Sequence, residues 1–566
     1  MAVAEHHSYS GLSPKRKIIT MVGVLLAMLL SSLDQTIVGT ALPQIVRDLG
    51  GLDHISWVVT AYLLASTISV PIYGKLSDMF GRKWFFFSGI VIFLIGSILS
   101  GLSQSMLQLI IFRAIQGIGG GAIMGNAFAI IGDLFEPAER GKWQGIMGGV
   151  FGLSSVIGPT LGGFLTDSAS WRWVFYVNLP LGLIAMAVVA YLMPKIRAAH
   201  GDKTIDYLGA ALLTSTLVPS LLALMWGGNQ YPWASVQILT MAIIGAISLA
   251  AFLAVERKAA QPILPLDLFK NRIFTVSVML TFLTSAALFG AIVYIPLFAQ
   301  LVMGASATNS GAILTPLMLG LVFASITSGQ IISRTGKYKN MAKLGLFVLA
   351  SGLVLLATMG ANVSQLGLMM RMVVTGMGLG LTMPIFTLSV QNAFDSSRLG
   401  VVTAGSQLFR GIGSTVGTAV LGSVFNSSLH QRTADLAQTD LSRLVQQHHL
   451  PFTAIVDPAK LQQTLSVEGQ SHILSSFAKI PGALGSQLTT AFHTYVIAGK
   501  GAFAASVSVV FLVGALIAGI AFLLSFALME IPLRSSKSKS AVAKAGNEFA
   551  VELGQANAND EPELVN

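Results

Sequence analysis

Residues 74–83 read Gly-Lys-Leu-Ser-Asp-Met-Phe-Gly-Arg-Lys and stand between two long apolar stretches. A membrane-spanning helix needs about 20 mostly apolar residues to cross roughly 30 Å of hydrocarbon, and both stretches reach that length. The charged residues between them therefore form a short turn at one membrane surface. In this turn Gly81 permits a tight bend, while Asp78 can cap the following helix or pair with Arg82 or with a neighbouring helix.

Apolar stretches of this kind recur along the rest of the chain. The fourteen candidates are residues 18–41, 55–74, 84–103, 107–131, 143–166, 173–193, 207–227, 236–255, 273–302, 309–332, 342–360, 365–391, 400–426 and 501–529. The first is too long for a cleavable signal peptide and shows no small-residue cleavage site. The sequence therefore predicts an all-α integral membrane protein with fourteen transmembrane helices.

The composition supports this prediction. Hydrophobic residues make up 53% of the 566 residues, charged residues only 10%, and the mean hydropathy is +0.73, whereas soluble domains carry roughly 25% charge. A soluble multidomain enzyme and a disordered scaffold are both excluded. The absence of cysteine excludes disulfides, zinc–thiolate sites and a catalytic thiol. The net charge of +10 fits basic cytoplasmic loops better than nucleic-acid binding.

The distribution of basic residues predicts the orientation. If an even number of spans leaves both termini inside, the inner segments hold most of the 34 Lys and Arg residues, as the positive-inside rule requires. We therefore expect a multi-pass protein of a plasma membrane with both termini cytoplasmic.

An internal repeat divides the chain. A shift of 259 residues superposes seven glycines of the first half on seven of the second: Gly117, Gly119, Gly121, Gly141, Gly152, Gly158 and Gly163 on Gly376, Gly378, Gly380, Gly400, Gly411, Gly417 and Gly422. Gly74 and Gly81 match Gly329 and Gly336 at a shift of 255. A same-sense repeat predicts two six-helix bundles related by an axis along the membrane normal, as in large secondary transporters.

The repeat sets the domain organisation. The expected segments are a cytoplasmic N-terminus (1–17), an N-terminal six-helix bundle (18–193), a linker with two inserted transmembrane helices (194–271), a C-terminal six-helix bundle (272–530) that contains a long outer loop (427–499), and a disordered cytoplasmic tail (531–566). In the loop, apolar residues recur at helical spacing among polar ones, so part of it is expected to fold against the mouth of the protein. These residues are Leu436, Leu441, Leu444 and Val445.

Asp34 is the one acidic residue that lies well inside a predicted span. A charged side chain near the middle of a membrane costs several kcal/mol, so a function is expected to retain it. One interpretation is a carboxylate that takes up and releases a proton. The alternative is a helix-end acid near the outer surface, if Pro43 ends the span.

Arg113 poses a similar question in the fourth span, because an arginine inside the membrane must find an acceptor or water. Gln116 and Asn126 add polar groups nearby, and Arg371 and Arg410 lie inside spans of the second half. The alternative for each arginine is a structural hydrogen bond to a neighbouring helix.

The fifth span contains Gly158-Pro159-Thr160-Leu161-Gly162-Gly163. Packing alone explains Gly158, Gly162 and Gly163, since small residues allow close helix contact. A helix that bends during function also explains Pro159. The glycines follow no strand, so they are not nucleotide loops, and the sequence shows neither a Walker motif nor a metal-ligand or nucleic-acid motif.

Several of these motifs resemble those of the major facilitator superfamily, and in particular its 14-helix drug:proton antiporter branch (EmrB/QacA type). The matching stretches are 33–43, 74–83, 113–121, 158–163, 171–182 and 410–414. Arg371 departs from the pattern, because it lies one residue out of phase with Arg113 in the repeat.

The resemblance implies a bacterial inner-membrane exporter, not an enzyme, that needs no cofactor and uses the proton gradient to export small amphipathic, often cationic compounds. Asp34 and Arg113 would then form the proton site, and the helix with Gly158 and Pro159 would bend. The gate would consist of Gly74, Asp78, Gly81, Arg82 and Lys83. A lipid, siderophore or metabolite exporter of the same fold, and more remotely a non-transporting sensor, remain alternatives. Whether a periplasmic adaptor binds is left open.

Overall fold

The computed structural model describes residues 13–50, 54–194, 204–228, 230–305, 313–433, 436, 439–448, 461–480 and 482–533. Within these residues, fourteen helices are long and apolar enough to cross a membrane, as predicted. The N-terminus up to residue 12 lies outside the described residues, as does most of the tail predicted to be disordered (531–566). Of this tail, residues 531–533 are described, and the N–H of Ile531 donates to the Tyr338 hydroxyl.

The described helices form two sets of six spans with two further spans between them. The first half consists of α1 (Pro14–Leu49), α2 (Ile55–Phe80), α3 (Arg82–Leu102), α4 (Met106–Leu134), α5 (Pro137–Ser168), α6 (Trp173–Tyr176) and α7 (Asn178–Leu192). The inserted helices are α8 (Tyr207–Trp226) and α9 (Val236–Glu256). The second half consists of α10 (Arg272–Leu301), α12 (Thr315–Thr335), α13 (Lys339–Ala357), α14 (Gln365–Asn392), α15 (Leu399–Thr433) and α19 (Ala483–Ser525). Short helices α16 (Asp440–Gln447), α17 (Leu461–Leu465) and α18 (Val467–Phe477) lie between α15 and α19.

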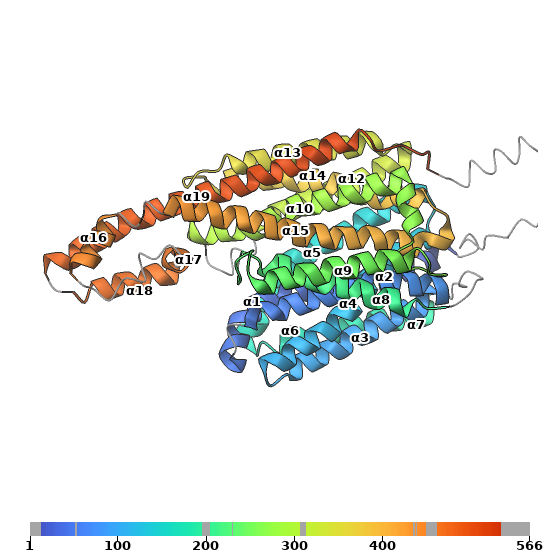
Figure 1. Cartoon of the computed structure of the whole chain (residues 1–566), viewed down its shortest axis with the longest axis horizontal. Coiled ribbons are helices and arrows are strands. Elements are labelled where there is room, and N and C mark those ends of the chain that lie inside the picture. Colours follow the sequence, from blue (N-terminus) through green and yellow to red (C-terminus); the bar gives the residue numbers. More distant parts are fainter. Residues whose placement is uncertain are drawn as a thin grey trace, which may run out of the picture.

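The two halves lie side by side (Figure 1). The blue and cyan helices of the first half form the lower part of the view, and the yellow to red helices of the second half form most of the upper part. The outer part of α19 projects at one end together with α16 and α18. We call this the Arg432 end, and the opposite end, where α2 meets α3, the Asp78 end.

The glycine repeat corresponds to equivalent packing in the two halves. A Cβ added at Gly117 of α4 would collide with the backbone of Tyr62 on α2, and one added at Gly376 of α14 would collide with the backbone of Leu317 on α12. In each half, the absence of a side chain lets the fourth helix lie directly against the second. The repeat is therefore a structural one.

The inserted helix α8 covers one seam between the halves, the one between α2 and α15. Leu213 and Leu217 of α8 share an apolar cluster with Leu64 of α2 and Leu408 of α15. Because α2 and α15 belong to different halves, α8 packs against both halves through apolar contacts. It is therefore part of the same bundle and not a separate unit.

Direct contact between the halves is close at the Asp78 end. Gly74 of α2 lies against Gly400 of α15, and Gly141 of α5 lies against Gly329 of α12. Toward the Arg432 end of α5, by contrast, a Cβ added at Gly163 would meet no atom within 4 Å. The two seams between the halves, α2 with α15 and α5 with α12, are thus closed at the Asp78 end. Toward the Arg432 end, α5 no longer packs against α12 at Gly163.

Helix α1 continues through Pro43 to Leu49, so Asp34 lies in the middle of the helix. The alternative interpretation of Asp34 as a helix-end acid is therefore wrong. Proline removes one backbone donor, but the remaining intrahelical hydrogen bonds are enough to continue this apolar helix.

The predicted outer loop is shorter than residues 427–499. Helix α15 runs on to Thr433, and α19 begins at Ala483. The C-terminal end of α15 and the N-terminal end of α19 carry polar residues at exposed positions, which lower the hydropathy without ending either helix. The connection contains short helices as expected, and Leu441 and Val445 of α16 are buried against α19 in one cluster with Phe492.

Candidate functional site: a buried ion pair and a contact between the halves

The Asp34 carboxylate is fully buried and accepts three side-chain hydrogen bonds. Arg113 Nη1 lies 2.5 Å from Oδ2, and the amides of Gln116 and Asn178 donate to Oδ1 at 2.8 and 3.0 Å. The donors come from α4 and α7, so the site joins three helices of the first half. Hydrogen bonds that involve charged groups are stronger than those between neutral groups, so these donors hold the Asp34 side chain firmly in place.

The Arg113 guanidinium is held from several sides as well. Its Nε donates to the carbonyl oxygen of Val58 at 3.2 Å, and its Nη1 also donates to Gln116 Oε1 at 2.7 Å. The guanidinium lies 4.4 Å from the centre of the Tyr62 ring. A cation over an aromatic face gains further stabilisation when it is removed from water, so Arg113 retains contacts that do not depend on Asp34.

A second layer orients Asn178. Its amide also donates to Ser97 Oγ at 3.0 Å, and Ser97 in turn donates to the carbonyl oxygen of Phe175 at 2.8 Å. The sequence analysis did not assign Asn178, Ser97 or Tyr62 to the site. The available signal was an asparagine within the apolar stretch that follows Trp171-Arg172-Trp173.

Asn126 lies away from this site. Its amide donates to the carbonyl oxygen of Ala122 within its own helix, and its Oδ1 is buried without a partner among the described residues. Of the two polar residues predicted near Arg113, the structure therefore brings only Gln116 to Asp34.

The predicted gate residues form a second charged group at the Asp78 end. Asp78 pairs with Arg82, whose Nε lies 2.7 Å from Asp133 Oδ2 and whose Nη1 donates to Ser77 Oγ at 2.6 Å. Arg82 thus binds two carboxylates. Gly81, with a φ of 103°, makes the turn before α3, and Lys83 is buried next to Arg82.

Asp78 caps a helix of the other half. Its two oxygens accept hydrogen bonds from the backbone N–H groups of Gly400 at 3.1 Å and Val401 at 2.8 Å. These groups open α15, and the N-terminus of a helix carries partial positive charge that favours an anion. Of the partners considered in the sequence analysis, Asp78 therefore takes Arg82 and a neighbouring helix, and the helix that it caps is α15 rather than the following α3.

The glycine-proline motif of α5 packs on α1 close to Asp34. A Cβ at Gly158 would collide with Thr36, and one at Gly162 would collide with Thr40. Thr36 also donates to the carbonyl oxygen of Ser154 at 3.0 Å. Pro159 lies inside a helix that continues to Ser168. Gly163 has no such neighbour, so close packing accounts for two of the three glycines.

The arginines of the second half are not part of the Asp34 site. The position that repeats Arg113 is held by the fully buried Met372, next to Arg371. Arg371 Nη1 and Arg410 Nε are buried without a hydrogen-bond partner in the described part of the chain. The repeat therefore holds for packing and not for charge.

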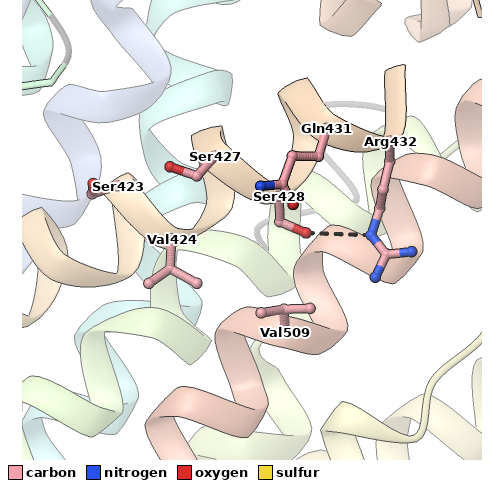
Figure 2. Close-up of a pocket in the computed structure, with 7 residues that line it drawn as sticks. All are labelled: Ser423, Val424, Ser427, Ser428, Gln431, Arg432 and Val509. Carbon is pink, nitrogen blue, oxygen red and sulfur yellow. Dashed lines mark hydrogen bonds between the residues drawn. The ribbon is translucent and has the colours of Figure 1, made fainter. Parts of the chain in front are cut away.

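The structure also contains an open pocket at the Arg432 end, between α15 and α19 (Figure 2). Three serines line it together with Gln431, Arg432 and two valines, and Arg432 Nε donates to Ser428 Oγ at 3.3 Å. The sequence analysis did not predict this pocket, because it depends on the continuation of both helices beyond the apolar stretches.

Two repeated bundles, two inserted helices and an ion pair sealed among the helices define a membrane protein of the transporter class. The chain belongs to the major facilitator superfamily, whose family model matches residues 24–418. This confirms the resemblance and the fold that it implied.

The relatives of the chain agree. The multidrug transporter protein MdtP of Bacillus subtilis (strain 168) is 40% identical over 546 residues, which cover 96% of this chain and 99% of the relative. Multidrug resistance protein 3 of the same organism is 42% identical over 405 residues, 71% of this chain and 78% of the relative.

Solved structures show the same fold at low identity. The human organic anion transporter MFSD10 gives a TM-score of 0.55 at 16% identity and covers 90% of this chain and 100% of its own. The proton:xylose symporter XylE gives a TM-score of 0.55 at 14% identity and covers 74% of this chain and 90% of its own.

Proposed function

We propose that the protein is a proton-coupled multidrug efflux antiporter that exports amphipathic, often cationic compounds by alternating access. The names of the two Bacillus relatives, a multidrug transporter and a multidrug resistance protein, support multidrug efflux. The observation that carries the proposal is the Asp34 carboxylate, which is sealed inside the first bundle and paired with Arg113.

A proton is the ligand that suits this site. Protonation of Asp34 removes the charge that attracts Arg113, but Arg113 keeps Gln116 and the carbonyl oxygen of Val58 as acceptors. The loss of one partner of a buried ion pair costs about 3–5 kcal/mol, which is enough to reverse a balance between two access states. Proton binding thus changes which state is favoured.

The contacts of α1 offer a path from Asp34 to the seam between the halves. Thr36, two residues after Asp34, binds α5 through Ser154 and packs against Gly158. Helix α5 packs on α12 of the second half, where Gly145 lies against Ser325. A shift of α1 on protonation would therefore move α5, and Pro159 would make the bend of that helix less costly.

The access state follows from the same contacts. At the Asp78 end the halves are joined by Asp78, Gly400 and Val401, so we assign that end as the closed gate. Because most basic residues flank this end, we place it and both termini on the cytoplasmic side of a bacterial inner membrane. Inward proton flow would then open it in each cycle, without a cofactor.

The test is reconstitution in liposomes with an imposed pH gradient, with ethidium and lumenal pH followed together. The native protein should move dye and protons in opposite directions, and Asp34→Asn should abolish both while the protein still folds. Asp440→Asn, in which the altered side chain is 83% exposed on α16, is the matched control and should behave as native. Proton-coupled dye movement that persists in Asp34→Asn would refute the assignment.

A further inference from the structure

Arg410 lacks the anionic partner that Arg113 and Arg82 possess. Arg113 pairs with Asp34, and Arg82 pairs with Asp78 and Asp133. The Arg410 Nε is buried without a partner, and no described carboxylate forms an ion pair with its guanidinium. An arginine is always charged, and an unpaired charge inside a membrane protein marks a pathway or a ligand site.

The packing of α15 shows which way Arg410 faces. Gly411 lies toward Thr67 of α2, and Gly413 lies toward Phe282 of α10. Leu408 and Ile412 belong to the apolar cluster that includes α8. With three directions occupied by α2, α10 and α8, the helical period places Arg410 on the remaining face.

That remaining face points into the space between the halves. Thr403 lies seven residues, or about two turns, before Arg410 and therefore on the same face. Its hydroxyl accepts a hydrogen bond from Gln391 Nε2 at 3.2 Å. Gln391 also donates to the carbonyl oxygen of Phe128 at 2.9 Å and accepts from Gln144 at 3.2 Å, so it joins α14 and α15 to α4 and α5 at the centre of the interface.

Arg410 therefore lies beyond the closed layer, on the side of the Arg432 end. The rise of a helix puts it about 10 Å from Thr403 along α15. Gln407, four residues after Thr403, lies on the same face, and its Nε2 is likewise buried without a partner. Two adjacent side chains thus present unused donors in the region where an alternating-access transporter binds its substrate.

We propose that Arg410 and Gln407 bind an anionic group, a carboxylate above all, of an amphipathic substrate. A guanidinium fork matches the two oxygens of a carboxylate and binds them in pairs, and the amide of Gln407 adds a third donor. The proposal rests on the function proposed above and deepens it: zwitterionic and acidic amphiphiles are substrates, in addition to the expected cations.

The experiment compares two dyes that differ in one group. Rhodamine B carries a free carboxylate, and its ethyl ester carries the same ring system without that charge. Equilibrium binding of both to the purified full chain should show tighter binding of the acid. In Arg410→Gln the acid should lose about ten- to a hundredfold in affinity, the usual range for a charge-assisted hydrogen bond, and the ester should change less than about twofold. Arg410→Lys should retain an intermediate preference.

Controls separate this role from folding and from coupling. Arg432→Gln removes a guanidinium from the pocket between α15 and α19 and should leave the preference for the acid intact. Gln407→Leu should reduce this preference less than Arg410→Gln. Because binding needs no pH gradient, it tests Arg410 even if proton-driven transport fails. Equal binding of both dyes by the native protein, as expected if Arg410 holds only a small anion such as chloride, overturns the proposal. An unchanged preference in Arg410→Gln, or an equal loss of both dyes, also overturns it.

Discussion

Asp78 on α2 accepts a hydrogen bond from the backbone N–H of Gly400 on α15 at 3.1 Å, across the boundary between the two halves. Gly400 is the repeat of Gly141, which packs against Gly329 at the other seam. The residue that repeats Asp78 there is Ser333, which carries no charge. One seam therefore has a carboxylate on a helix N-terminus in addition to close glycine packing, whereas the other seam has close glycine packing and an uncharged serine at the repeated position.

The charged seam gives the first prediction. Asp78→Asn removes the charge that favours the N-terminus of α15, although Arg82 keeps Asp133 as a partner. Hydrogen bonds of charged groups contribute about 1.5–3 kcal/mol, so the closed state should lose about tenfold or more in population. We expect reduced dye efflux with dye binding preserved, measured side by side. Asp267→Asn, which alters an exposed ion pair with Arg398, is the control. Normal efflux, or a loss confined to binding, would rule out a gating role.

A second prediction concerns the packing of α1 on α5. Gly158→Ala places a Cβ against the Thr36 side chain, and overpacking of this kind costs about 1–3 kcal/mol. We expect a lower thermal stability in detergent and slower efflux, with partial recovery in the double variant that also carries Thr36→Ala. Gly163→Ala introduces the same methyl group five residues further on, where nothing lies within 4 Å, and should be neutral. Equal effects at both positions would show that helix propensity, not contact, is responsible.

The sequence was sufficient to predict the number of spans, the repeat and the two charges at Asp34 and Arg113, because apolar length and buried charge leave strong local signals. It could not show that Asn178 completes the site, since an uncharged amide costs little in an apolar stretch and its partner lies 144 positions away. The extension of α19 was missed for a related reason. A helix that leaves the membrane keeps its hydrogen bonds while its hydropathy falls.

The third prediction concerns the segment after α19. The Tyr338 hydroxyl donates to the carbonyl oxygen of Met529 at 3.2 Å and accepts from the N–H of Ile531 at 3.0 Å. Burial raises the pKa of Tyr338 above its ordinary value of 10.0. A raised pKa in the folded state means that the neutral hydroxyl stabilises the fold below about pH 10, and that this stabilisation is lost as the pH rises through the raised pKa.

Tyr338→Phe should therefore lower the free energy of unfolding by about 1–2 kcal/mol at pH 8. The variant should also lose less stability than the native protein when the pH is raised from 8 to 11. Thermal unfolding in detergent at both values measures this. Tyr207→Phe, at a position that is 74% exposed, is the control. If the native protein and Tyr338→Phe lose the same amount of stability between pH 8 and pH 11, ionisation of Tyr338 does not cause the loss.

The last prediction concerns the short helices at the Arg432 end. Leu441 of α16 is fully buried in one apolar cluster with Phe477 and with Phe492 of α19, and Figure 1 shows α16 beside the projecting part of α19. Leu441→Asp would place an unpaired charge in an apolar cluster, and burial of such a charge costs several kcal/mol. Helix α16 should therefore detach while the spans stay inserted. Gln446→Asp introduces the same charge on the exposed side of the same helix.

Detachment should be visible as faster proteolysis between residues 434 and 482 in Leu441→Asp than in Gln446→Asp. If the docked helices stabilise one access state, the efflux rate should also change, because a shift of about 1.4 kcal/mol alters the populations tenfold. The substrate range should change with it, since a molecule that leaves at the Arg432 end passes these helices. Efflux kinetics that stay native for several chemically distinct dyes, despite faster proteolysis, would show that this segment is a tether without influence on transport.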